Sequence, residues 1–541
     1  MNNLNSFLKE YLLKVWSKRH IKAALFFVMQ ILLLCAVGCA VGPSFKQPNK
    51  GVPPVWDGFN TAVPSQKNTA VSRPVELVQW WKIFNDATLT TLVEKALDAN
   101  LDLRMAAARV RQARAARIVA VTGLLPSGEA LGSYRRSYQG KSTSGTSGKN
   151  SVTSGNDASD SSGYSNNSSA SDNNTTNSGV SGSTTSAQTT GSLSVKPHEL
   201  DLFQVGMDAI WEIDIFGGVR RGVEAAHADL QTAIEDLRDV MVTLIAEVGT
   251  TYISLRGYQQ QIAITRKNLE AQQRTAEITR KRFRVGFISG LDVANAETQA
   301  SATQAQIPVL ESAARQAIYS LSVLLNLEPA ALEQKLSQES PLPSIPQEVP
   351  VGLPSELLRR RPDIRRAEAQ MHAATARIGV AIADLFPKFS LTGSFVFKND
   401  ELNTLGNWGN RVWTWGPDVK WPIFDAGRIY GNIKIQNALQ EQALATYEKT
   451  VLTALKDVET VLVAFNKEQQ HYASLLEAVV SSRRAVDLSM RLYTAGRTDF
   501  LNVLTAQQSL YTYEDALVQS NRSLATDLVA LYKALGGGWE Q

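Results

Sequence analysis

Hydrophobic and polar residues alternate along four short segments of this chain of 541 residues. The segments cover about residues 128–138, 200–212, 389–399 and 411–421. In the last segment Trp413, Trp415 and Trp421 share one parity, and polar residues such as threonine, aspartate and lysine share the other. A period of two over about ten residues predicts strands, and the tryptophan-rich ends favour a membrane sheet over a half-buried soluble sheet with the same alternation. The first segment is the weakest, because it contains Arg135 and Arg136.

Two long segments repeat apolar residues every seven positions instead. The repeated positions are Met241, Val248, Leu255 and Ile262 in the first segment, and Val451, Val458 and Phe465 in the second. Such heptads predict coiled-coil helices. The first segment runs from about residue 223 to residue 285 without proline. At about 1.5 Å per residue its roughly 63 residues would form a rod of about 95 Å, which would cross much of a bacterial periplasm.

Each long helix is expected to end at a glycine, Gly286 or Gly496, because glycine readily adopts the left-handed conformation that ends helices. A second helix then returns, to about Leu325 in one case and Leu535 in the other. The alanine- and arginine-rich composition before the first strand predicts a further helical stretch over residues 80–121.

The chain repeats itself at two different spacings. Gly286 and Gly496 are 210 positions apart (496 − 286), whereas Pro126 and Pro387 are 261 apart (387 − 126). One half therefore carries about 51 extra residues (261 − 210), between Tyr134 and Trp211. The same region holds a segment rich in serine, threonine, asparagine and glycine, residues 137–194, which has too few apolar side chains to fold and is expected to be a disordered extracellular loop.

These patterns predict an internally duplicated chain. The expected parts are a signal segment (1–38), an extended segment (39–80), repeat 1 (81–326), a linker (327–352), repeat 2 (353–536) and a tail (537–541).

Four strands cannot close a barrel, and an open sheet edge leaves backbone groups unsatisfied in lipid. Bacterial barrels have at least eight strands, so several copies must share one barrel. Two copies would supply eight strands and three copies twelve, and a polar lumen favours the wider barrel. The expected fold class is therefore an α/β membrane protein, with four transmembrane β-strands per chain in a shared barrel above a long coiled-coil helical tunnel.

The N-terminus has the features of a secretory signal. A basic stretch precedes an apolar run, Ala23–Gly38, that is short for a bilayer span. The run ends in Ala36-Val37-Gly38-Cys39, which resembles a bacterial lipoprotein processing site. Cys39 is therefore expected to carry a covalent lipid, and Ala40 in the next position indicates sorting to the outer membrane. An ordinary signal peptide with an incidental cysteine, or an uncleaved anchor, would share much of this pattern.

Composition and charge exclude several classes of function. The net charge of +4 and the lack of a dense basic patch give no support for nucleic-acid binding. The two cysteines, Cys35 and Cys39, cannot build a disulfide framework or a metal knuckle. The five histidines are scattered, and neither a phosphate-binding loop nor a nucleophile motif is present. We therefore expect no enzyme activity, no metal site and no cofactor other than the lipid.

Taken together, the order and spacing of five motifs resemble the TolC family of outer membrane factors, especially its lipoprotein subgroup. The motifs are Cys39–Pro43, Trp80-Trp81 with Phe84, Ala108–Ala113, Arg360–Ile364, and Ala495-Gly496 through Ala506-Gln507. The resemblance implies a homotrimer with one twelve-stranded barrel and a long periplasmic tunnel. It also implies an outer-membrane location, with most of the mass in the periplasm, and partnership with a periplasmic adaptor and an inner-membrane efflux transporter.

The resemblance assigns roles to the two helix turns. Adaptor docking is implied for Val285, Gly286, Phe287, Ala495, Gly496 and Arg497. A gate is implied for Asp292, Tyr493 and Arg497, with Asp499 as a further acidic candidate. Asn502 and Thr505 stand where the family has an acidic pair, which argues against a ring of carboxylates at these two positions. The simpler alternative is a plain helix turn whose polar residues only contact solvent.

The function predicted from these features is a passive exit duct that expels drugs or other small toxic solutes. Two alternatives remain open from the sequence. One is an exit duct for type I protein secretion, and the other is a non-conducting coiled-coil spacer of the cell envelope.

Overall fold

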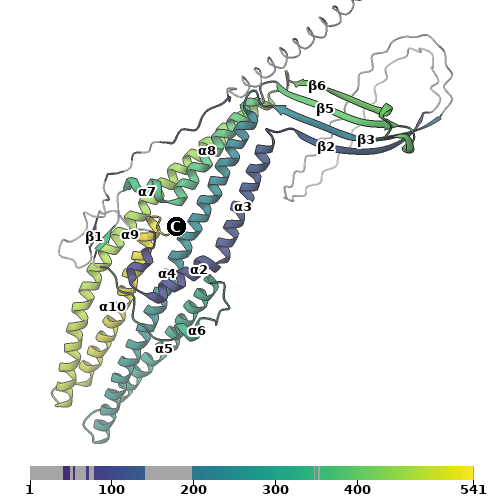
Figure 1. The fold of residues 1–541 in the computed structure, drawn as a ribbon. Helices are drawn as coiled ribbons and strands as arrows, with labels where there is room; N and C mark the ends of the chain where they lie inside the picture. Colours follow the sequence, from purple (N-terminus) through teal and green to yellow (C-terminus); the bar gives the residue numbers. More distant parts are fainter. Residues whose placement is uncertain are drawn as a thin grey trace, which may run out of the picture. The chain divides into compact units, whose positions relative to one another are not determined.

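The computed structural model describes residues 40–48, 51, 53–54, 56, 69–71, 78–139, 198–346, 348–350 and 354–539 (Figure 1). The signal segment, Cys39 and most of the serine-rich insertion lie outside these residues. The chain divides into two compact units. A helical unit contains residues 1–126, 211–391 and 417–541, and a strand unit contains residues 127–210 and 392–416.

The long helices of the helical unit confirm the heptad prediction. Helix α4 (Gly218–Arg284) and helix α9 (Arg428–Thr494) each have 67 residues. Their return helices, α5 (Gly290–Leu324) and α10 (Phe500–Ala534), each have 35 residues. The two hairpins are thus equal in length, as an internal duplication requires. None of the helices in the described ranges combines the length and apolar character that a bilayer span requires.

The helical stretch predicted over residues 80–121 is interrupted twice. It consists of η2 (Trp80–Phe84), α2 (Ala87–Ala99) and α3 (Leu101–Thr122). Asp86 ends the first break by accepting hydrogen bonds from the backbone of the next helix, and Asn100 does the same at the second. These short polar side chains satisfy the free N–H groups of a helix start, so they favour a new helix over continuation of the old one.

Repeat 2 begins with α7 (Pro354–Arg360) and α8 (Pro362–Ala383). The expected linker contains a short helix, α6 (Glu333–Leu336), and a strand, β4 (Glu348–Pro350). Strand β4 pairs in parallel with β1 (Thr69–Val71), in the segment expected to be extended. This small sheet could not be predicted from the sequence, because three-residue strands are too short to show a period.

The strand unit confirms the four predicted strands to within two residues at each end. They are β2 (Ser127–Gln139), β3 (His198–Ile213), β5 (Lys388–Asn399) and β6 (Arg411–Lys420). They form one sheet in the order β2-β3-β5-β6, with β2 antiparallel to β3. Two single turns, η3 (Leu402–Thr404) and η4 (Trp408–Asn410), connect β5 to β6. Within the described chain, β2 and β6 therefore each have one free edge.

The charged residue Arg136 of β2 has partners in the neighbouring strand. Arg136 forms ion pairs with Glu199 and Asp201, and the Tyr134 hydroxyl donates to Asp201 at 2.8 Å. The Tyr134 ring stacks on Phe203, with centroids 4.8 Å apart. Cross-strand pairs of this kind stabilise a sheet, so Arg136 does not oppose the strand assignment.

The main apolar core of the helical unit joins the two repeats. Trp80, Trp81 and Phe84 are almost fully buried in it, and Trp80 stacks on Tyr532 of α10 at 5.4 Å between ring centroids. Along α4 the core ends at Ile262. A second and much smaller apolar cluster lies near the ends of the two hairpins.

Candidate functional site

Both hairpins turn with the same backbone geometry. Gly286 and Gly496 have φ of 77° and 70°, a region that other residues rarely adopt. At the first turn, the N–H of Phe287 donates to the carbonyl of Arg282 at 3.0 Å; at the second, the N–H of Arg497 donates to Leu492 at 2.8 Å. This pattern is the Schellman ending of a helix, which satisfies carbonyls that would otherwise lack partners. The duplicated sequence thus produces two equivalent tips.

The two tips differ in what they expose. Val285 and Phe287 of the first turn are 66% and 77% exposed, whereas the second turn exposes Ala495, Gly496 and the cation of Arg497. A partner would therefore meet two large apolar side chains at the first turn and only small residues and one cation at the second. Adaptor docking at these residues stays a prediction.

Tyr493, a predicted gate residue, is buried where the two hairpins meet. It is 1% exposed and packs in the small cluster with Ala276, Ala296, Phe500 and Val503. These residues come from α4, α5, α9 and α10. Tyr493 therefore links both hairpins at the level of the turns.

The basic partner of Tyr493 within the chain is Arg282, which the sequence analysis did not identify. Its guanidinium donates to the Tyr493 carbonyl and lies 4.6 Å from the centroid of the Tyr493 ring. A cation at the last carbonyls of α9 is also favoured by the helix dipole. Arg497, the basic residue predicted for the gate, is exposed, and no hydrogen bond or ion pair of its side chain is found within the described part of the chain.

The other predicted gate residues have local partners. Asp292 accepts a hydrogen bond from the backbone of Ser289 at 3.3 Å and completes a capping box at the start of α5. Asn502 donates to the Thr498 hydroxyl at 2.7 Å, and Asp499 precedes α10 without a side-chain capping bond. Within one chain, no hydrogen bond between described residues joins Asp292, Asp499 or Asn502 to Tyr493. Their role in a gate stays a prediction.

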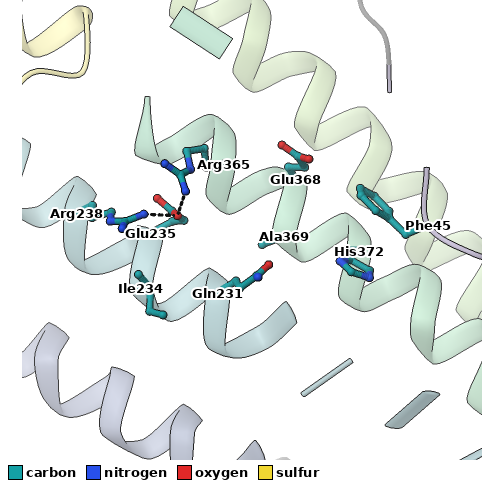
Figure 2. Close-up of a pocket in the computed structure, with 9 residues that line it drawn as sticks. All are labelled: Phe45, Gln231, Ile234, Glu235, Arg238, Arg365, Glu368, Ala369 and His372. Carbon is teal, nitrogen blue, oxygen red and sulfur yellow. Dashed lines mark hydrogen bonds and ion pairs between the residues drawn. The ribbon is translucent and has the colours of Figure 1, made fainter. Parts of the chain in front are cut away.

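A cavity of about 340 Å³ lies between α4 and α8 (Figure 2). The Glu235 carboxylate accepts from Arg238 at 2.6 Å and from Arg365 at 2.9 Å. Burial raises the pKa of Glu235, and the two arginines oppose this effect. Both guanidiniums also lie over the ring of Trp539, which follows α10. These charges fasten the C-terminal tail to the two helices, so they are explained by packing rather than by chemistry on a substrate.

The residues that follow Cys39 are held against the same pair of helices. Arg221 donates to the carbonyls of Val41 at 3.1 Å and Gly42 at 3.3 Å. Phe45 stacks on His372 with ring centroids 4.5 Å apart, and His372 in turn lies 2.9 Å from Glu224. The start of the expected mature chain is therefore fixed to the helical unit.

Asp527 of α10 gives the helical unit a pH dependence. Burial, together with the nearby charge of Glu468, raises the pKa of this carboxyl from 3.8 to about 6. The fold prefers the protonated form, so the stabilisation is complete below about pH 4 and is lost as the pH rises through about 6. We expect Asp527→Asn to abolish this loss, which amounts to at most about 3 kcal/mol.

Thermal unfolding of the detergent-solubilised protein between about pH 4 and pH 7 measures the effect. The Asp527→Asn variant should be the more stable one at pH 7. A matched control is Asp487→Asn, an exposed carboxylate of α9 paired with Arg491. An equal pH dependence in wild type and Asp527→Asn would contradict the assignment.

With this geometry in place, comparison with known proteins decides the family. The model of the outer membrane efflux protein family matches residues 92–327 and 353–537, one match in each repeat. The chain belongs to the outer membrane efflux protein family. The predicted resemblance and the predicted outer-membrane location are thereby confirmed, and this is a family of channel proteins rather than enzymes.

Individual relatives cover nearly the same length. The pyoverdine export outer membrane protein OpmQ of Pseudomonas aeruginosa is 32% identical over 86% of this chain and 88% of its own length. Nodulation protein T of Rhizobium leguminosarum bv. trifolii is 28% identical over 93% of this chain and 95% of its own length. Among solved structures, the outer-membrane channel OprN has a TM-score of 0.78 at 33% identity and covers 93% of this chain and 100% of its own. This chain thus shares the fold of an outer-membrane channel.

Proposed function

We propose that three copies of this chain form a passive exit duct, anchored in the outer membrane by a lipid on Cys39. A periplasmic adaptor would dock at the turns around Gly286 and Gly496, and an inner-membrane pump would supply the energy. The expelled solutes would be drugs or other small toxic molecules. The observation that carries the proposal is the row of packed helices α3, α4, α8 and α9 in the helical unit. The row ends in α3 on one side and in α9 on the other.

That succession follows from the duplication. Helix α3 packs on α4, α4 packs on α8, and α8 packs on α9 (Figure 1). Because α3 corresponds to α8 and α4 corresponds to α9, the inner contact between α4 and α8 has an unused counterpart, namely α9 with the α3 of another copy. A head-to-tail contact of this type generates a ring when the rotation between successive copies closes.

Both free ends expose large apolar side chains that such a contact could bury. Helix α3 exposes Met105, Ile118 and Val119, and α9 exposes Tyr430 and Ile435, each by more than half of its surface. Monomeric proteins rarely leave large contiguous apolar patches in water, so these faces favour burial against another copy.

The turns next to the sheet extend the same argument. Phe386 stacks on Phe216 inside the chain, with centroids 4.5 Å apart. Leu125 is the counterpart of Phe386 at the repeat spacing (386 − 125 = 261), and it is 60% exposed. Phe424, in the turn that corresponds to the one carrying Phe216, is 89% exposed. In the ring, Phe424 of one copy would cover Leu125 of the next.

We therefore expect the double variant L125C/F424C to form disulfide-linked ladders in the outer membrane, up to trimers. Oxidised membranes are analysed on non-reducing gels. The pair L125C/T298C is the control, because Thr298 lies on α5, well away from the turns next to the sheet. Linked dimers that never extend to trimers would contradict a three-membered ring.

The relatives favour small solutes over secreted proteins. Their names refer to pyoverdine export and to antibiotic, solvent and toluene efflux. The direct test is a deletion strain scored for sensitivity to antibiotics and solvents, with the intact gene restored as control. We expect sensitivity to rise at least several-fold; an unchanged drug profile together with a protein-secretion defect would favour the alternative.

A further inference from the structure

The contact between α4 and α8, which we call the inner seam, is closed by matched charges. Five acidic residues of α4 each meet an arginine or a histidine of α8, with their closest atoms 2.7–2.9 Å apart. The pairs are Glu224–His372, Asp229–Arg377, Glu235–Arg365, Asp236–Arg366 and Asp239–Arg366.

The corresponding seam between copies has no such match. In the proposed ring, α9 of one copy meets α3 of the next copy as α4 meets α8 within the chain. The counterparts of α4 residues lie 210 positions later, and those of α8 residues lie 261 positions earlier. The counterpart of His372 is Arg111, so Lys434 meets Arg111 of the next copy where Glu224 meets His372. The five acidic positions of α4 become Lys434, Leu439, Ala445, Thr446 and Lys449 in α9.

A third cation faces the same seam. A Cβ added at Gly218, the first residue of α4, would lie 3.0 Å from the Cβ of Ala383 in α8. The counterpart of Gly218 is Arg428, the first residue of α9. Arg428 and Lys434 are six residues apart (434 − 428), or about 9 Å along the helix, so their long side chains can converge on one group.

Acidic residues do not neutralise these cations. Helix α3 has none after Asp102, and the first acidic residue within α9 is Glu441, about two turns beyond Lys434. The carboxylate of Asp425, in the turn before α9, is already bound to two backbone N–H groups at 2.7 and 3.0 Å. Among the residues that the structure describes, the side chains of the three cations are exposed and form no hydrogen bond or ion pair. Because like charges repel, closing this seam favours an anion between them.

The inner seam is covered by the N-terminal segment of its own chain. Ala40 lies so close to Gly217 that a Cβ added there would be 2.7 Å from the Ala40 Cα. Further along the segment, Phe45 lies against His372 (Figure 2). This segment directly follows Cys39, the residue expected to carry the lipid. Each copy has one N-terminus, which it uses at its own inner seam, so the seam between copies lacks this cover.

The uncovered seam also has apolar side chains close to the membrane strands. Ile118 and Tyr430 are 60% and 61% exposed. Ile118 precedes the start of β2 by nine residues (127 − 118), and Arg428 follows the end of β6 by eight (428 − 420). Cations beside an apolar surface at a membrane boundary match the phosphate and the acyl chains of an anionic lipid.

We propose that each seam between copies binds one phospholipid with a net negative headgroup. Arg428 and Lys434 of one copy and Arg111 of the next hold its phosphate, and its acyl chains lie toward Ile118 and Tyr430. The lipid cancels the repulsion across this seam and covers it, as the N-terminal segment covers the inner seam. This inference rests on the proposed ring, to which it adds a lipid as a structural component.

Native mass spectrometry tests the site on the full-length protein, delipidated in detergent and titrated with phosphatidylglycerol. We expect up to three bound phosphatidylglycerol molecules per trimer, and binding of phosphatidylcholine with the same acyl chains at least about tenfold weaker. The variant R428Q/K434Q should lower the affinity for phosphatidylglycerol roughly 25-fold, a factor of about five for each cation.

Two single variants complete the design. R111Q changes the other side of the seam and should lower the affinity about fivefold, even if the double variant folds poorly. K467Q is the matched control, because it removes an exposed cation of α9 far from this end of the helix, and it should bind like the wild type.

Three results would overturn the lipid site. They are equal affinity of the two lipids, equal affinity of wild type and folded R111Q, and displacement of phosphatidylglycerol by an equal concentration of inorganic phosphate, which would indicate a site for a free anion. The particle mass counts chains and lipids separately. A particle that is not a trimer would contradict the ring, whereas a trimer that binds no phosphatidylglycerol would overturn the lipid site alone.

Discussion

Replacing Gly206 with valine is expected to prevent the sheet from forming and so to keep the protein out of the outer membrane. A Cβ at this position would lie 2.5 Å from the Cα of Val396 and closer still to the carbonyl of Phe395. Both obstacles are backbone atoms of β5, which cannot move aside without breaking the pairing with β3. Overpacking of this kind costs at least about 3 kcal/mol, and more where the backbone must move.

Membrane insertion of the Gly206→Val variant is measured as the fraction of protein that resists extraction by urea. Gly132→Val is the matched control in the same sheet, because no heavy atom lies within 4 Å of its Cβ position. We expect the control to insert like the wild type. Normal insertion of Gly206→Val would show that β3 and β5 do not pair as described.

Replacing Arg282 with methionine is expected to open the tip. The side chain supplies a charged hydrogen bond to the Tyr493 carbonyl and a cation–π contact with its ring. Together these are worth about 2–3 kcal/mol, so the ratio of open to closed channels should rise roughly 30- to 150-fold. Single-channel recording in planar bilayers measures the open fraction directly.

Two variants distinguish the effect of losing the Arg282 contact from the effect of losing any positive charge near the tip. Arg282→Lys keeps the charge but not the planar guanidinium, and it should fall between wild type and methionine. Arg497→Met removes the exposed cation of the neighbouring turn, and it should leave the open fraction unchanged. A larger rise in the open fraction for the Arg497 variant than for the Arg282 variant would show that the gate depends on Arg497, the basic residue predicted from the sequence.

The strands and long helices could be predicted because their periods persist over many residues. The strand assignments rest on alternation, and the helix ends at Gly286 and Gly496 rest on one backbone conformation that glycine adopts readily. The breaks at Asp86 and Asn100 were missed, because a single capping side chain decides each of them and the alanine-rich sequence after Asn100 favours one continuous helix.

The tip contact could not be predicted in the same way. Arg282 and Tyr493 are 211 positions apart (493 − 282), and their meeting depends on the register between two hairpins. The polar heptad positions from Gln261 to Arg282 are visible in the sequence, but their partners on the second hairpin are not. A period shows which side of a helix is polar; packing decides what that side meets.

The proposed duct requires three chains to share one barrel. Native mass spectrometry of the protein extracted in detergent tests this directly, since it counts the chains in each particle. We predict particles of three chains that lose the barrel only when the chains separate. A particle of one or two chains that keeps a complete barrel, or a delipidated monomer that stays dissolved without detergent, would contradict the account.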